Sequence, residues 1–195
     1  MIKKITFILI HLFAFNLKIH AVPTVNNLQT FYKITGVTEQ ELRQQLNDLG
    51  PISMGRHYDA KTSWYINWNY KWRTDNEREK GCYLTEVNVT ADIVTLLPAW
   101  ENKNYGSSEP RLKWENYLAN LIRHEEGHGN NGREAAAELE EALLKIPPML
   151  SCELLQSAIQ NTAQNIINQH NNWDVTYDLT TQHGKTQGAY FPGTE

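Results

Sequence analysis

The sequence predicts an α+β fold, with a small antiparallel sheet in the N-terminal half packed with a long helix and a second, C-terminal helix. Two observations lead to this class. Over residues 62–72, large apolar residues alternate with polar ones, which is the period of a half-buried strand. From about residue 110 to residue 145, apolar residues instead recur at helical spacing. Strand patterns that precede helical patterns favour one domain with segregated elements.

Three strands are expected in the N-terminal half. Residues 30–34 form a short candidate, and residues 62–72 form the clearest one. The polar residues 74–81 predict a hairpin loop, after which residues 82–97 return as a β-branched strand. The aromatic row in residues 64–72 could bind a ligand such as sugar rings, but core packing is the favoured interpretation.

A short helix is expected between the first two strands, over about residues 39–48. Thr38 is placed to cap it, and Glu41 follows three residues later, which completes a capping box. Gly50 and Pro51 end it.

Residues 98–108 are expected to form a loop before the long helix of about residues 110–145. Pro110 suits the first turn of that helix, and the proline pair at 147–148 ends it. Ser151 can cap a second helix that runs to about His170, and a polar tail follows from Trp173.

The first 21 residues resemble a secretory signal peptide. Lys3 and Lys4 precede an apolar stretch at residues 5–15, and Ala21 ends a plausible cleavage site. An uncleaved anchor is the alternative, but Lys18 interrupts the apolar run. We therefore expect a secreted or periplasmic domain of residues 22–195, without stable membrane insertion after cleavage.

The charge of the mature chain bears on its partners. The whole chain has 18 basic and 22 acidic residues, and three of the lysines lie in the signal segment. Cleavage would leave 15 basic residues and a net charge of −7. No basic footprint for nucleic acid is present, so we expect no nucleic-acid partner.

Cys82 and Cys152 are the two cysteines of the chain. In an exported protein, such a pair predicts a disulfide, here between a strand and a helix. The alternative is two buried thiols. Neither cysteine has the spacing of a C-x-x-C metal or redox pair.

The long helix carries the motif H-E-x-x-H at His124, Glu125 and His128. Residues four apart share one helix face, so both imidazoles can bind one Zn²⁺ ion. Glu125 points about 100° further round the helix, where it can act as a general base. Bound histidines must be neutral, so metal affinity and activity should fall below about pH 6.

A catalytic zinc needs a third protein ligand. His183 is favoured, because it lies in a glycine-flanked tail that can fold back over the helix. Glu134 and His57 are the alternatives, whereas His170 is expected to be solvated. Tyr177 is a candidate catalytic residue, either as an oxyanion donor or, like Asp178, as a partner of a ligand histidine.

Together these stretches resemble a bacterial family known as domain of unknown function 922, whose members are described as secreted zinc-dependent proteases. The resemblance covers nearly the whole mature chain. Its residues are 32–36, Glu41, Leu42, 64–70, Cys82, 97–100, 114–128, Cys152, Tyr177, Asp178, Thr181, His183, Gly184 and 187–189. The paired tail pattern supports His183 as a ligand.

The resemblance and the motif together imply an exported zinc-dependent hydrolase, most simply a peptidase that acts on a protein or peptide. Two alternatives stay open. One is a non-catalytic metal-binding or envelope-interaction protein, and the other is hydrolysis of a different amide, such as a cell-wall crosslink. The sequence does not specify the oligomeric state.

Overall fold

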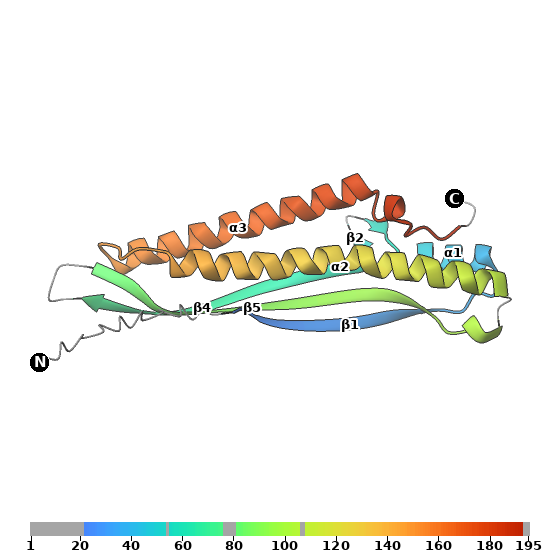
Figure 1. Ribbon diagram of the computed structural model, residues 1–195, viewed down its shortest axis with the longest axis horizontal. Coiled ribbons are helices and arrows are strands. Elements are labelled where there is room, and N and C mark those ends of the chain that lie inside the picture. The colour runs from blue at the N-terminus through green and yellow to red at the C-terminus, as the bar shows by residue number, and fades with distance from the viewer. Residues whose placement is uncertain (1–21, 54, 76–80, 106–107, 193–195) are drawn as a thin grey trace, which may run out of the picture.

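A three-stranded sheet and two long helices make up most of the molecule (Figure 1). The computed structural model describes residues 22–53, 55–75, 81–105 and 108–192. The predicted signal segment lies outside these described residues, as do residues 76–80 of the predicted hairpin loop and residues 106–107 of the predicted 98–108 loop. The predicted α+β class is confirmed.

The sheet has β5 (Gly81–Trp100) in the centre, with β4 (Lys61–Asp75) on one side and β1 (Thr24–Ile34) on the other. β4 and β5 form the predicted antiparallel hairpin. β1 is parallel to β5, so the sheet is mixed rather than purely antiparallel. The alternation of apolar and polar residues within a strand does not show whether its neighbour is parallel or antiparallel. That depends on the connection between the strands, here the segment from β1 to β4.

All three strands are longer than predicted. β4 continues to Asp75, so residues 74 and 75 of the predicted hairpin loop are strand. β1 begins at Thr24, because its polar first half still pairs with β5 and Asn26 donates a 2.7 Å hydrogen bond to Asp92. β5 continues to Trp100, so the expectation that Pro98 opens a loop was wrong. Pro98 lies beyond Leu96, the last partner of β4, and an edge at this point tolerates the missing N–H.

The first helix, α1 (Glu39–Leu49), begins as predicted. The Thr38 hydroxyl accepts a hydrogen bond from the backbone N–H of Glu41, and the Glu41 carboxylate accepts one from the N–H of Thr38. The two-residue strands β2 (Ile52–Ser53) and β3 (Arg56–His57) follow it as a small antiparallel pair. These elements bring the chain from β1 to the start of β4.

Helix α2 (Ser108–Leu144) lies along the sheet, and α3 (Cys152–Thr181) runs back along α2 (Figure 1). The sequence predicts that α3 ends near His170, but the helix continues to Thr181. Residues 171–181 lack an apolar stripe and are stabilised by contacts with α2 instead. No helix in the described ranges is long and apolar enough to cross a bilayer.

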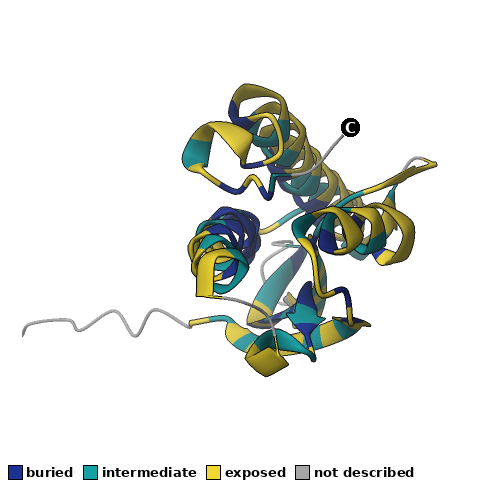
Figure 2. Cartoon of the chain, turned by 90° about the vertical axis from the view of Figure 1, so that its right-hand side faces the viewer, coloured by how far each residue is buried: buried dark blue, intermediate teal, exposed yellow. Residues whose placement is uncertain are grey.

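Two apolar clusters lie between the helices and the sheet. Figure 2 shows the molecule end on, with the helices on one side of the sheet. One cluster packs the N-terminal part of α2 against α1, with Trp114 and Tyr117 at its centre. The other packs the C-terminal part of α2 against β5 and α3, around Leu139 and Leu143. The middle of α2, between the clusters, is buried but polar.

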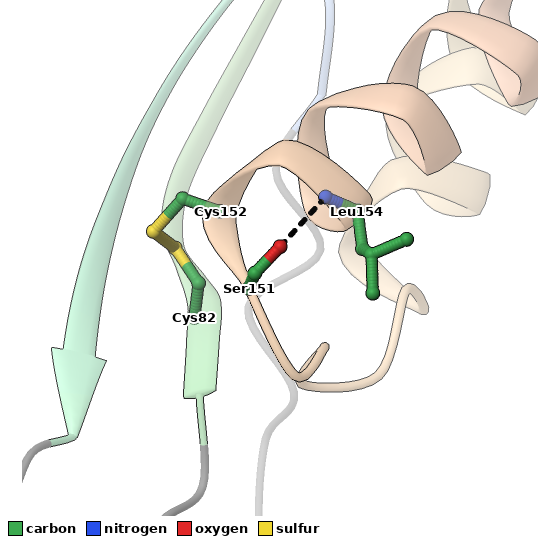
Figure 3. Close-up of a disulfide and its surroundings, with 4 residues drawn as sticks. All are labelled: Cys82, Ser151, Cys152 and Leu154. Carbon is green, nitrogen blue, oxygen red and sulfur yellow. Dashed lines mark hydrogen bonds between the residues drawn. A yellow bond between two sulfur atoms is a disulfide. The ribbon is translucent and has the colours of Figure 1, made fainter.

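The predicted disulfide between Cys82 and Cys152 is present (Figure 3). It joins the start of β5 to the first residue of α3, next to Ser151, whose hydroxyl accepts a hydrogen bond from the N–H of Leu154. Two backbone hydrogen bonds between Cys82 and Met149 align the same junction. Disulfides of this kind are typical of proteins in oxidising compartments.

Removing this disulfide should destabilise the protein strongly. The bond closes a loop with a sequence separation of 70 residues, for which the chain-entropy model gives about 4–4.5 kcal/mol. We expect the double variant Cys82→Ser/Cys152→Ser to lose roughly that much free energy of unfolding in a urea titration. A loss below about 1 kcal/mol would show that the bond contributes little.

Candidate metal centre

The buried face of α2 becomes polar at its middle. His124, Glu125 and His128 are 2%, 5% and 7% exposed, with apolar residues of the same helix buried before and after them. Buried polar groups are costly unless they are hydrogen-bonded or used in function. Three titratable side chains at this buried position therefore indicate a function.

The two histidines converge on one carboxylate of α3. Nε2 of His124 lies 3.1 Å from Oδ1 of Asp178, and Nε2 of His128 lies 3.0 Å from the same oxygen. Donor atoms of these three residues all lie within 4.8 Å of one another. The three side chains could therefore hold one metal ion.

The other ring nitrogen of each histidine has its own partner. Nδ1 of His124 lies 2.9 Å from Oε1 of Gln187, and Nδ1 of His128 lies 2.8 Å from Oδ1 of Asp174. Ligand histidines in metalloproteins are usually oriented in this way, with the second nitrogen bonded to a carboxylate or a carbonyl. Both Nε2 atoms are thus directed at Asp178, and the donor set is compatible with a bound metal ion.

Hydrogen bonds between the histidines and the carboxylates shift the pKa values of Asp178 and His128 in opposite directions. Burial by itself would raise the pKa of Asp178, but hydrogen bonds from His124 and His128 hold this pKa well below its usual range. Burial would likewise lower the pKa of His128, but hydrogen bonds to Asp174 and Asp178 raise it to about 10. In the metal-free protein at neutral pH, His128 is therefore an imidazolium paired with carboxylates.

Metal binding should consequently release a proton. His128 must lose the proton on Nε2 before it can coordinate, and below its metal-free pKa of about 10 that proton is present. We expect about one proton released per zinc at pH 7.5, and an affinity that falls by up to tenfold for each pH unit lowered. Calorimetry in buffers of different ionisation enthalpy measures both. A pH-independent affinity between pH 6 and pH 9 would contradict this assignment.

Glu125 lies beside this group. Burial raises the pKa of Glu125, while a hydrogen bond with the Thr62 side chain and the charges of His128 and His124 act in the opposite direction. Its Oε2 atom is buried and has no hydrogen-bond partner among the described residues. A carboxylate with an unused acceptor beside metal-binding side chains is suited to receive a proton.

Tyr177, the other predicted catalytic residue, packs face to face on the His124 ring, with centroids 4.9 Å apart. Its hydroxyl accepts a hydrogen bond from Nε2 of Gln187 at 3.1 Å. A Cβ atom at Gly127 would lie 2.5 Å from that hydroxyl oxygen, which explains a glycine inside α2. These contacts fix the His124 ring, and the catalytic role of Tyr177 stays a prediction.

His183 borders the group. Its Nδ1 atom lies 3.4 Å from Oδ1 of Asp178, and its side chain is about half exposed. Its ring packs 4.8 Å from the ring of Tyr58. The left-handed residues Gln182 and Gly184 turn the chain back after α3, as the tail was expected to do. Its role as a metal ligand stays a prediction.

The alternative third ligands lie elsewhere. Glu134 is exposed on α2, and Nδ1 of His57 bonds to the carbonyl of Gly50. His170 was expected to be solvated, and this was wrong. It is 8% exposed and is hydrogen-bonded to Asn131 and Glu138. None of these three belongs to the group of donors around Asp178.

Sequence reasoning missed Asp178 as a direct donor, and Asp174 and Gln187 as partners of the histidines. A signal for the two aspartates is present. Asp174 and Asp178 are four residues apart, as His124 and His128 are, so they share one face if the helix reaches them. The sequence predicts that α3 ends near His170, so both aspartates fall in the predicted tail, where a spacing of four residues implies no shared face.

The fold and the site define an α+β protein with a His-His-Asp group that is compatible with metal binding. The chain belongs to the family described as bacterial protein of unknown function (DUF922), whose model matches residues 29–184. The match includes His124, His128, Asp178 and His183, and it ends before Gln187. No curated protein and no solved structure matches significantly.

Proposed function

We propose that this protein is an exported zinc-dependent hydrolase that cleaves peptide bonds, with Glu125 as its general base. The observation that carries the proposal is the combination of three convergent donors with the buried, unpartnered Oε2 atom of Glu125. A purely structural metal site has no need of such a carboxylate. The disulfide and the expected signal peptide support export.

His124, His128 and Asp178 would hold the zinc ion. When bound, zinc would activate a water molecule and polarise the scissile carbonyl. Glu125 would accept the proton of that water at Oε2 and later deliver it to the leaving amine. The burial that raises the pKa of Glu125 brings it closer to the working pH, which suits a group that both takes and returns a proton.

The test is zinc content followed by turnover. Purified residues 22–195 should bind about one zinc per chain, as expected for a catalytic site. The zinc-loaded protein should then cleave at least one member of a panel of unfolded proteins and peptides, and chelation should abolish the cleavage. Cleavage of peptidoglycan crosslinks alone would change the substrate class. Failure to bind zinc after reloading would refute the proposal.

A non-catalytic metal-binding protein is the second candidate, and the position of His183 favours it. If His183 joined the other three residues, four protein ligands would close the coordination sphere, as in structural zinc sites. Cobalt substitution distinguishes the two candidates. A spectrum that changes when azide or a hydroxamate is added indicates an open site, whereas an unchanged spectrum together with inert substrates supports the second candidate.

A further inference from the structure

We propose that Asp174, held by Trp64, is a positioning residue that keeps a proton on Nδ1 of His128, so that Nε2 faces the metal. The inference rests on the metal centre of the proposed function. It concerns a carboxylate that is not itself a member of the donor group. It also gives the sheet a direct part in the site, because Trp64 belongs to β4.

Asp174 accepts two hydrogen bonds, one on each oxygen. Oδ1 lies 2.8 Å from Nδ1 of His128, and Oδ2 lies 2.7 Å from Nε1 of Trp64. An indole N–H can only donate, and an ionised carboxylate can only accept. With Oδ2 taken by the indole, Oδ1 pairs with Nδ1 of His128 only if that nitrogen carries the hydrogen.

The tryptophan is well placed to anchor this arrangement. Trp64 pairs with Ile93 of the central strand. A Cβ atom at Gly132 would lie 2.7 Å from both Cβ and Cγ of Trp64, so α2 packs closely over the base of the indole. The indole N–H is thus fixed between the sheet and α2. Its direction sets the carboxylate of Asp174, which in turn sets the imidazole of His128.

His124 is held differently. Its Nδ1 partner is the neutral amide of Gln187, which also donates to the Tyr177 hydroxyl. An amide can exchange its oxygen and nitrogen by rotation, whereas a carboxylate presents an acceptor either way. The proton position of His128 is therefore the one that the protein fixes by charge.

The experiment is a rescue by a second substitution. Asp174→Asn keeps the shape but leaves one acceptor for two donors, so the amide nitrogen must face either the imidazole or the indole. We expect the dissociation constant for Zn²⁺, measured with a competing chelator, to rise about 10–100-fold. Adding Trp64→Phe removes the competing donor, so the Asn oxygen can turn to His128, and the affinity should return to within about threefold of that of Trp64→Phe alone.

Two controls separate this role from general damage. Trp64→Phe alone removes the anchor but leaves both oxygens of Asp174 as acceptors, so it should weaken zinc binding by less than Asp174→Asn does. Asp48→Asn, which removes an exposed carboxylate of α1, should leave zinc affinity within about threefold of wild type. Circular dichroism melting of each variant checks folding. If Asp174→Asn does not fold, long-range ¹H–¹⁵N NMR on the zinc-loaded wild type reads the tautomer directly. A hydrogen on Nδ1 of His128 is expected there.

Each result decides between the alternatives. Unchanged zinc affinity in Asp174→Asn overturns the inference about Asp174 but not the proposed metal centre, because zinc would still bind. A loss that Trp64→Phe does not restore assigns Asp174 to charge or packing and also overturns it. A hydrogen on Nε2 of His128 does the same. Absence of zinc binding in the wild type refutes the metal centre itself, and this inference with it.

Discussion

Glu125→Gln should leave zinc binding intact and reduce turnover by about 10²–10⁴-fold, the usual contribution of a general base. The substitution preserves shape but gives an amide that cannot take a proton. Oε2 of Glu125 has no partner in the described structure, so no structural hydrogen bond of that atom is lost. The measurement is kcat and zinc content of the variant beside wild type.

The same variant should not be less stable, and this distinguishes it from damage to the core. Burial raises the pKa of Glu125 in the folded protein, so the charged carboxylate destabilises the fold at pH values above its unfolded pKa. A neutral amide removes that cost, and the melting temperature at pH 7 should stay equal or rise. The exposed neighbour Glu126 supplies the control Glu126→Gln, which should change neither quantity. Full activity in Glu125→Gln would exclude the general-base role.

Asp178→Asn should weaken zinc binding by more than roughly 100-fold. Loss of a residue that only hydrogen-bonds to a metal ligand typically costs about 10–100-fold. Both Nε2 atoms face Oδ1 of Asp178, so this oxygen lies where the donor set converges. The amide that replaces the carboxylate lacks its charge and is a poor ligand for zinc. Zinc affinity by competition with a chelator is again the measurement.

His183→Ala is the matched comparison, because His183 was the ligand favoured from the sequence. Its Nδ1 atom is 3.4 Å from Oδ1 of Asp178, and its side chain is about half exposed. If Asp178 is the third ligand, His183→Ala should weaken zinc binding far less than Asp178→Asn does. The reverse order would restore His183 as the third ligand and make Asp178 its partner. Glu134→Gln should be neutral in either case, since Glu134 is exposed.

Several elements could be predicted because their signals are local. The capping box at Thr38 and Glu41 involves residues three apart, and it begins α1 as expected. Alternation along β4 and helical spacing along α2 also reflect side chains of one element packing on one face. The pair His124 and His128 belongs to the same class, because four residues of helix place both rings together without any other part of the chain.

The errors lie where tertiary contacts override local preference. Residues 171–181 are polar and were expected to be a tail, yet they are helical in α3. Trp173 stacks on Tyr177, Tyr177 stacks on His124, and Asp174 and Asp178 bond to the histidines of α2. None of these contacts leaves an apolar period in the sequence. The same reason applies to the polar first half of β1, which is held by its pairing with β5.

By itself, the sequence determined the two histidines, the glutamate between them and the helix that presents them, because all three depend on the geometry of a single helical turn. Only the tertiary structure decided the rest of the site. Asp178 lies 50 residues after His128, and it reaches the imidazole only because α3 folds back along α2 and remains helical to Thr181. Trp64 comes from β4, which α2 meets through Gly132. These contacts between α2, α3 and β4 depend on how the elements pack, and no short sequence pattern predicts them.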